Sequence, residues 1–138
     1  MKSKHFILQE FVPKELYEKY KDKCWEFLDP DLIKVVDIIK EEFPEGTCTI
    51  NNWKWGGDRN WSGIRTPNSP YYSYSSMHSW GKAVDMVFSK YSADEVRRFI
   101  IDNPKNYKEF ECIKGIETDI SWVHIDTRNR ETRITFKP

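Results

Sequence analysis

The chain has 138 residues, which is the size of one ordinary domain. Its 22 basic residues balance its 22 acidic residues, so no net field draws it to nucleic acid or to an anionic membrane surface. No apolar run approaches the roughly 18 residues of a membrane-spanning helix, and the segment from Met1 to Glu10 lacks the features of a signal peptide. We therefore expect one soluble, cytoplasmic, monomeric domain.

The first 46 residues are expected to form a helical part. Asp29 and Pro30 have the residue types of an N-cap and a first helical position, and apolar residues then recur at helical spacing as far as Phe43. This pattern predicts a helix over about 30–43. A weaker helical pattern over 13–25 predicts a second helix that pairs with it.

The remainder of the chain alternates β-forming runs with one long loop and one helix. A capping box from Ser92 to Glu95 predicts a helix that ends near Asp102. From Gly56 to Ser79 the Gly, Asn, Ser, Pro and Tyr composition supports neither periodicity, which predicts a long loop of the kind that often carries function. Strands are predicted near 48–53, 83–88, 110–117, 121–127 and 132–136. The order predicts an α+β fold with a central antiparallel sheet and flanking helices.

Two of the three histidines lie in short segments that also contain a carboxylate. His78 precedes Asp85 closely, and His124 lies further along the chain. A catalytic zinc site takes three protein ligands from His, Asp or Glu and leaves one position open, so two imidazoles and a carboxylate suit it. Asp85 falls within a predicted strand among small and apolar neighbours, where a carboxylate is costly unless it is paired or metal-bound. A hydrogen bond between His78 and Asp85 that only closes a loop is the alternative.

The pattern Ser76-x-His78-x-x-Gly81-x-Ala83-x-Asp85, followed by Trp122-Val-His124, resembles the signature of the zinc D-alanyl-D-alanine peptidases. That superfamily includes phage L-alanyl-D-glutamate endolysins and the hedgehog fold. The resemblance implies that His78, Asp85 and His124 bind one zinc ion, with Ser76 supporting them. It covers roughly residues 47–128, which would form the metal-site core of a single domain spanning 1–138.

Just upstream, Ser62-Gly63-Ile64-Arg65 resembles the family's Ser-Gly-Tyr-Arg element, with Ile64 at the usual aromatic position. The resemblance implies that Arg65 contacts the substrate and stabilises the developing oxyanion, for which a planar guanidinium is well suited. A position on the surface or a role in fixing the loop is the alternative.

The catalytic base is less directly indicated, because family members carry Glu or Asp three or six residues before the second histidine. Those positions hold Ser121 and Thr118 here. The candidates are Glu117 and Asp119. A tight turn over residues 118–121 would place Glu117 across from Trp122 and diagonally beside His124. Asp119 would then lie in the turn, so this register favours Glu117 as the base.

Asp126 follows His124 by two residues and shares its strand face. It could therefore orient the imidazole of His124. Alternatively, it is an exposed strand carboxylate that pairs with Arg128 or Arg130.

The resemblance as a whole implies a zinc peptidase that hydrolyses an amide bond in peptidoglycan or a related peptide containing D-amino acids. A cell-wall hydrolase encoded by a bacteriophage, acting after lysis or from a virion, would suit this activity. The alternative is a non-catalytic zinc-containing module that binds a cell wall or belongs to a virion, and the absence of a base at either usual spacing favours it. Sites of this ligand type accept several divalent ions, so zinc itself is an expectation.

Overall fold

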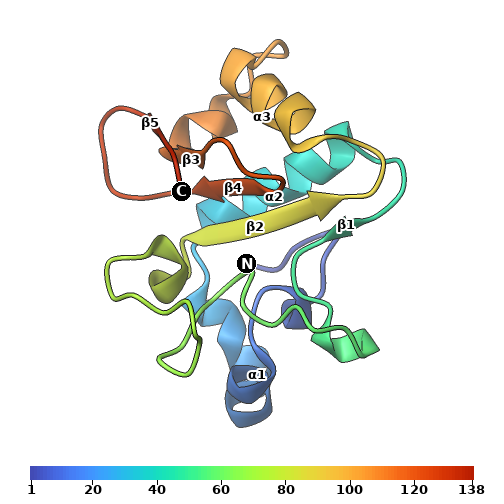
Figure 1. Cartoon of the computed structure of the whole chain (residues 1–138), viewed down its shortest axis with the longest axis vertical. Coiled ribbons are helices and arrows are strands. Elements are labelled where there is room, and N and C mark those ends of the chain that lie inside the picture. Colours follow the sequence, from blue (N-terminus) through green and yellow to red (C-terminus); the bar gives the residue numbers. More distant parts are fainter.

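The computed structural model describes all 138 residues as one α+β domain, as the sequence predicts at this level. Its α-helices are α1 (Lys14–Tyr20), α2 (Pro30–Glu42) and α3 (Ala93–Asp102). Its strands are β1 (Cys48–Thr49), β2 (Ala83–Phe88), β3 (Gly115–Glu117), β4 (Val123–Asp126) and β5 (Ile134–Phe136). Short 3-10 helices connect several of these elements (Figure 1). None of the helices combines the length and apolar character needed to cross a bilayer.

Helix α2 forms where the sequence predicts it and supplies much of the core. The Asp29 side chain accepts a hydrogen bond from the Asp31 amide, and Pro30 occupies the first turn. The buried apolar residues of α2 share one hydrophobic cluster with Val84 of β2 and Ile125 of β4. In Figure 1 the helix runs behind these two strands. It therefore covers one face of the sheet and leaves the other face for polar side chains.

The helix predicted over 13–25 is interrupted. Helix α1 ends at Tyr20 because Lys21 has a positive φ of 51°, a conformation that a continuing right-handed helix does not allow. A 3-10 helix, Lys21–Phe27, follows it. The predicted helix α3 is confirmed, including its capping box, in which the Ser92 hydroxyl accepts from the Glu95 amide at 3.1 Å.

The sheet has the strand order β1-β2-β4-β3-β5. The pairs β1–β2, β2–β4 and β3–β4 are antiparallel, but β5 runs parallel to β3. The prediction of an antiparallel sheet is therefore wrong at this edge, and the sheet is mixed. β4 already has a neighbour on each side, and β5 pairs with the free edge of β3. The connection from β3 to β5 passes through β4, so β5 can run in the same direction as β3.

All predicted strands except β2 are shorter than expected, two of them markedly. The run 48–53 forms strand only at Cys48–Thr49, because the backbone amides of Asn51 and Asn52 donate to the carbonyls of Glu10 and Arg59 and not to β2. The run 110–117 begins inside a 3-10 helix, Lys108–Cys112, before β3. The predicted loop over 56–79 contains no α-helix or strand, and its last residues enter a 3-10 helix, Met77–Trp80.

The register of the sheet lines up three polar side chains. Asp85 of β2 lies opposite His124 of β4, and Glu117 of β3 lies opposite the same histidine. Directly opposed residues of antiparallel strands point to the same face. Val84 and Met86 point the other way, into the core. The row Asp85, His124 and Glu117 therefore lies on the face that α2 does not cover.

Candidate metal centre

His78 is fixed by a short 3-10 helix at the end of the long loop. The Ser76 hydroxyl accepts from the His78 amide at 3.3 Å and caps this helix. Gly81 ends it with a φ of 69°, and a side chain there would overlap the Phe27 carbonyl oxygen. The Nδ1 of His78 lies 2.8 Å from the carbonyl oxygen of Gly63. A carbonyl can only accept, so Nδ1 carries the proton and Nε2 is left with its lone pair.

His124 is fixed in the opposite tautomer. Its Nε2 donates to Oδ2 of Asp126 at 2.9 Å. Asp126 is completely buried and also accepts from Nε and Nη2 of Arg128, at 2.7 and 2.6 Å. The sequence left an orienting role and an exposed pair with arginine as alternatives for Asp126. In the structure Asp126 contacts both His124 and Arg128. The expected pairing with Arg128 is therefore present, but the expectation that Asp126 is exposed is wrong.

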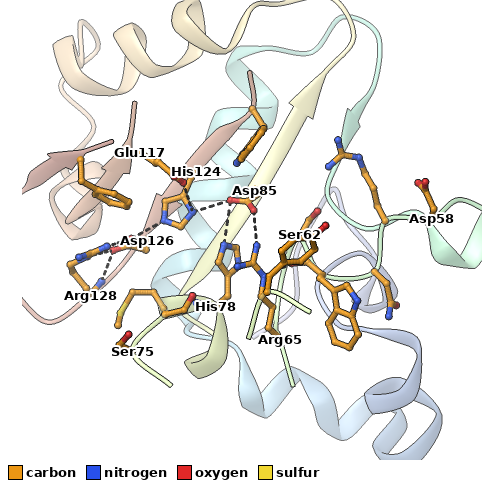
Figure 2. A pocket seen from close by; sticks show the side chains of 18 residues that line it. Asp58, Ser62, Arg65, Ser75, His78, Asp85, Glu117, His124, Asp126 and Arg128 are labelled. Carbon is orange, nitrogen blue, oxygen red and sulfur yellow. Dashed lines mark hydrogen bonds and ion pairs between the residues drawn. The ribbon is translucent and has the colours of Figure 1, made fainter. Parts of the chain in front are cut away.

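The free ring nitrogens of the two histidines converge on one carboxylate (Figure 2). Oδ1 of Asp85 lies 3.3 Å from Nε2 of His78 and 2.9 Å from Nδ1 of His124. The three side chains are buried, and their ligand atoms all lie within 4.8 Å of one another. They could therefore hold one metal ion.

The partners behind the ligands support this interpretation over a simple loop-closing hydrogen bond. Metal-binding histidines donate their second ring N–H to a carbonyl or a carboxylate, which fixes the tautomer. His78 does so to Gly63 and His124 does so to Asp126. Two nitrogens and one carboxylate oxygen are also a donor set that divalent transition metals accept. The residues present therefore fit a metal ion.

The acid–base state of the group favours a cation. Burial works to raise the pKa of Asp85, but its interactions with the imidazoles of His124 and His78 outweigh this effect and hold the pKa well below its usual range. Burial works to lower the pKa of His124, yet hydrogen bonds to Asp126 and Asp85 raise it to about 9. Burial also works to raise the pKa of Asp126, but hydrogen bonds with Arg128 and His124 lower this pKa to about 2. Both carboxylates are thus ionised at neutral pH, and a bound cation would replace a proton on His124.

Glu117 lies closer to the histidine than the sequence argument placed it. The segment between β3 and β4 spans residues 118–122, so Glu117 faces His124 directly and not diagonally. Its Oε2 is 4.0 Å from Nδ1 of His124, the nitrogen that faces Asp85. The predicted tight turn is wrong because the buried guanidinium of Arg97 donates to the carbonyls of Ile120 and Trp122 and holds the segment open.

Asp119, the other candidate base, lies away from the ligands. It has a φ of 60°, which is typical of a turn, and its side chain is largely exposed. Its carboxylate pairs with Lys137 at 3.6 Å. The structure therefore brings only Glu117 of the two candidates to His124.

Arg65 lies beside the ligands and not on the open surface. Its Nη2 is 3.2 Å from Oδ2 of Asp85, and its Nε donates to the Trp61 carbonyl at 2.8 Å. The Tyr71 ring lies 5.5 Å from the guanidinium, within cation–π range. Burial lowers the pKa of Arg65, while Asp85 and Glu117 act in the opposite direction.

One cavity of about 770 Å³ is lined by the three candidate ligands together with Glu117 and Arg65. It also contains residues that sequence analysis did not single out as functional, among them Phe136. The ring of Phe136 is 5.6 Å from that of His124 and packs against the Arg128 guanidinium. No sequence signal identifies Phe136, because it reaches the site through the unexpected parallel pairing of β5, which sets it opposite Glu117.

Comparisons with models of protein families, with curated proteins and with solved structures found no match to this chain.

Proposed function

We propose that this protein is a zinc-dependent peptidase that hydrolyses an amide bond in peptidoglycan or in a related peptide containing D-amino acids. The observation that carries the proposal is the buried group of His78, Asp85 and His124 with Glu117 directly opposite His124. The substrate class is supported by the resemblance of the motifs around His78 and His124 to the zinc D-alanyl-D-alanine peptidases.

A zinc ion held by the three ligands would supply a Lewis acid that polarises water and the scissile carbonyl. Glu117 lies on the metal-facing side of His124. It takes a proton from the attacking water while the water oxygen forms a bond to the carbonyl carbon. Negative charge then grows on the carbonyl oxygen, and Arg65 stabilises it through Nη1, which makes no hydrogen bond within the protein. As the C–N bond breaks, Glu117 passes the proton to the leaving amine.

Replacement of Glu117 tests this function, because Glu117→Gln keeps the size of the side chain but cannot accept a proton. We expect the variant to fold and to bind zinc, while its turnover number falls at least about 10²-fold. The assay is mass spectrometry of muropeptides released from purified peptidoglycan by zinc-loaded protein.

Asp119→Asn is the matched control, since Asp119 is exposed and paired with Lys137. It should retain wild-type turnover. If Asp119→Asn lost activity and Glu117→Gln kept it, the assignment of the base would be wrong. If the wild-type protein released no fragment from any peptidoglycan, the proposal of a hydrolase would be wrong, and a zinc-containing binding module would replace it.

A further inference from the structure

The segment between Arg65 and Lys82 contains no Asp, Glu, Lys or Arg, although residues of these types make up 32% of the chain. It consists largely of serine and tyrosine, and it ends with the 3-10 helix that contains His78. A surface without formal charges offers no opposite charge to an ionic ligand. This segment is therefore suited to a neutral ligand.

Four aromatic side chains of the segment are exposed to solvent. Tyr71, Tyr74 and Trp80 are 67%, 76% and 61% exposed, and Tyr72 is 39% exposed. The three tyrosines form hydrogen bonds only through their backbone atoms, so their phenol hydroxyls have no partner within the protein. Exposed apolar side chains that occur in a group, and not singly, mark interaction sites.

An aromatic side chain can also serve to fix a loop in place, as Trp53 does. Its Nε1 donates to the Val12 carbonyl at 2.8 Å, and its ring lies 6.0 Å from that of Tyr17. Trp80 also donates through Nε1, to the Tyr74 carbonyl at 2.7 Å, but its ring stays mostly exposed. The hydrogen bond orients the indole, and packing leaves most of its ring free. Trp80 thus presents an apolar surface that is already oriented before a ligand binds.

The exposed rings border the cavity that contains the candidate metal ligands. The hydrogen bond of Trp80 closes residues 74–80 into a loop. Within this loop, Ser75 and His78 line the cavity (Figure 2). Tyr71 lines the same cavity directly. A ligand held on these rings would therefore lie next to the candidate metal centre.

A pyranose sugar matches this combination of rings and hydroxyls. One face of the sugar presents C–H groups that contact the negative face of an aromatic ring, and its rim presents hydroxyls that exchange hydrogen bonds with phenols and serines. A charged peptide would find no ionic partner between Thr66 and Gly81. A purely apolar partner would remove the phenol hydroxyls from water without giving them a partner, which is unfavourable.

We propose that residues 66–81 bind the neutral sugars of a glycan strand, with the rings of Tyr74 and Trp80 as stacking surfaces, while the adjacent cavity receives a peptide attached to that strand. This inference rests on the proposed function and adds a second recognition element to it. Because peptidoglycan contains both components in one polymer, the sugar contact raises the effective concentration of the peptide at the cavity.

The probe is N-acetylchitotetraose, a short neutral oligomer of N-acetylglucosamine that carries no peptide. Its binding to the zinc-loaded wild-type protein is followed by heteronuclear NMR, in which each tryptophan indole N–H gives its own signal. We expect the signal of Trp80 to shift on titration. The signal of Trp55 should not shift, because Trp55 is equally exposed but lies outside the segment and the cavity.

Tyr74→Ala tests the stacking surface without disturbing the fold, because the Tyr74 side chain is exposed and only its backbone carbonyl accepts a hydrogen bond. We expect Tyr74→Ala and Trp80→Ala each to weaken binding of the tetrasaccharide about tenfold. Trp55→Ala is the matched control and should bind like the wild-type protein. Melting curves by circular dichroism confirm that each variant is folded.

A stem pentapeptide without sugar is the second probe, and its affinity should not fall in Tyr74→Ala. Equal weakening of both probes would show that the segment binds peptide and would overturn the inference. Unchanged tetrasaccharide affinity in Tyr74→Ala and Trp80→Ala, or a wild-type dissociation constant above about 10 mM, would also overturn it. So would a Trp80 signal that shifts with protein concentration alone, since a second copy of the chain would then occupy this surface.

The proposed function can fail separately, because the tetrasaccharide contains no bond that a peptidase cleaves. Tetrasaccharide binding that depends on Tyr74 and Trp80, in a protein that releases no fragment from peptidoglycan, would refute the peptidase and support the glycan site.

Discussion

Asp126 fixes the orientation of the His124 ring and the nitrogen that carries its proton. It accepts from Nε2 of His124 and from two nitrogens of Arg128. Asp126→Asn keeps the size but turns one acceptor oxygen into a donor, so it cannot serve both partners. We expect zinc affinity to fall about 10- to 100-fold, as for other losses of groups that orient a ligand. Competition with a chromogenic chelator measures this affinity.

The exposed Asp119 offers a control of the same chemistry, and Asp119→Asn should bind zinc like the wild-type protein. Equal zinc affinity in Asp126→Asn and wild-type protein would mean that Asp126 does not orient the ligand.

At the scale of residues, the sequence singled out the three candidate ligands and the orienting role of Asp126, but not the acceptor for His78. The scarcity of histidine and the resemblance of the surrounding motifs to a known family carried that prediction. The acceptor for His78 is the carbonyl of Gly63, which has no side chain to mark it. Such a backbone partner depends on the path of the whole loop and leaves no sequence signal.

Among the elements, strands β3 and β4 approach each other closely at one pair. Gly115 lies opposite Asp126, and a Cβ at Gly115 would overlap both carboxylate oxygens of Asp126. Gly115→Ala must therefore displace either the strand or the carboxylate. Overpacking of this kind costs about 1–3 kcal/mol, so we expect a lower melting temperature by circular dichroism together with weaker zinc binding.

Thr135→Ala provides the comparison for Gly115→Ala, because Thr135 lies on the neighbouring β5 with an exposed side chain. Thr135→Ala should change neither the melting temperature nor the zinc affinity appreciably. A Gly115→Ala protein that binds zinc as tightly as the wild type would show that Asp126 can move without releasing His124.

Elements with strong local signals were predicted well, and elements defined by distant partners were not. The N-cap of α2 and the capping box of α3 are local, so both helices were placed correctly. The length of the β3–β4 connection depends on Arg97, which lies on another element. The direction of β5 depends on its pairing with β3, which is not its neighbour along the chain. Short-range periodicity contains neither kind of information.

For the molecule as a whole, the ligands connect the end of the long loop with two strands of the sheet. A metal ion bound only to the folded state stabilises it by about 2.7 kcal/mol when the free ion is at 100 times its dissociation constant. We expect a chelator to lower the melting temperature by on the order of 10 °C for a domain of this size. Re-addition of zinc should restore it. Identical melting curves with and without chelator would show that the triad does not bind a stabilising ion.

The central claim is that His78, Asp85 and His124 hold one zinc ion, and zinc stoichiometry by native mass spectrometry tests it most directly. His5 is the only other histidine; it is exposed and pairs with Glu41, so His5→Ala is the matched control. The account predicts about one zinc per chain in the wild-type and His5→Ala proteins and none in His78→Ala, Asp85→Ala or His124→Ala. Zinc retained in His124→Ala, or absent from a zinc-supplemented wild-type protein, would contradict it.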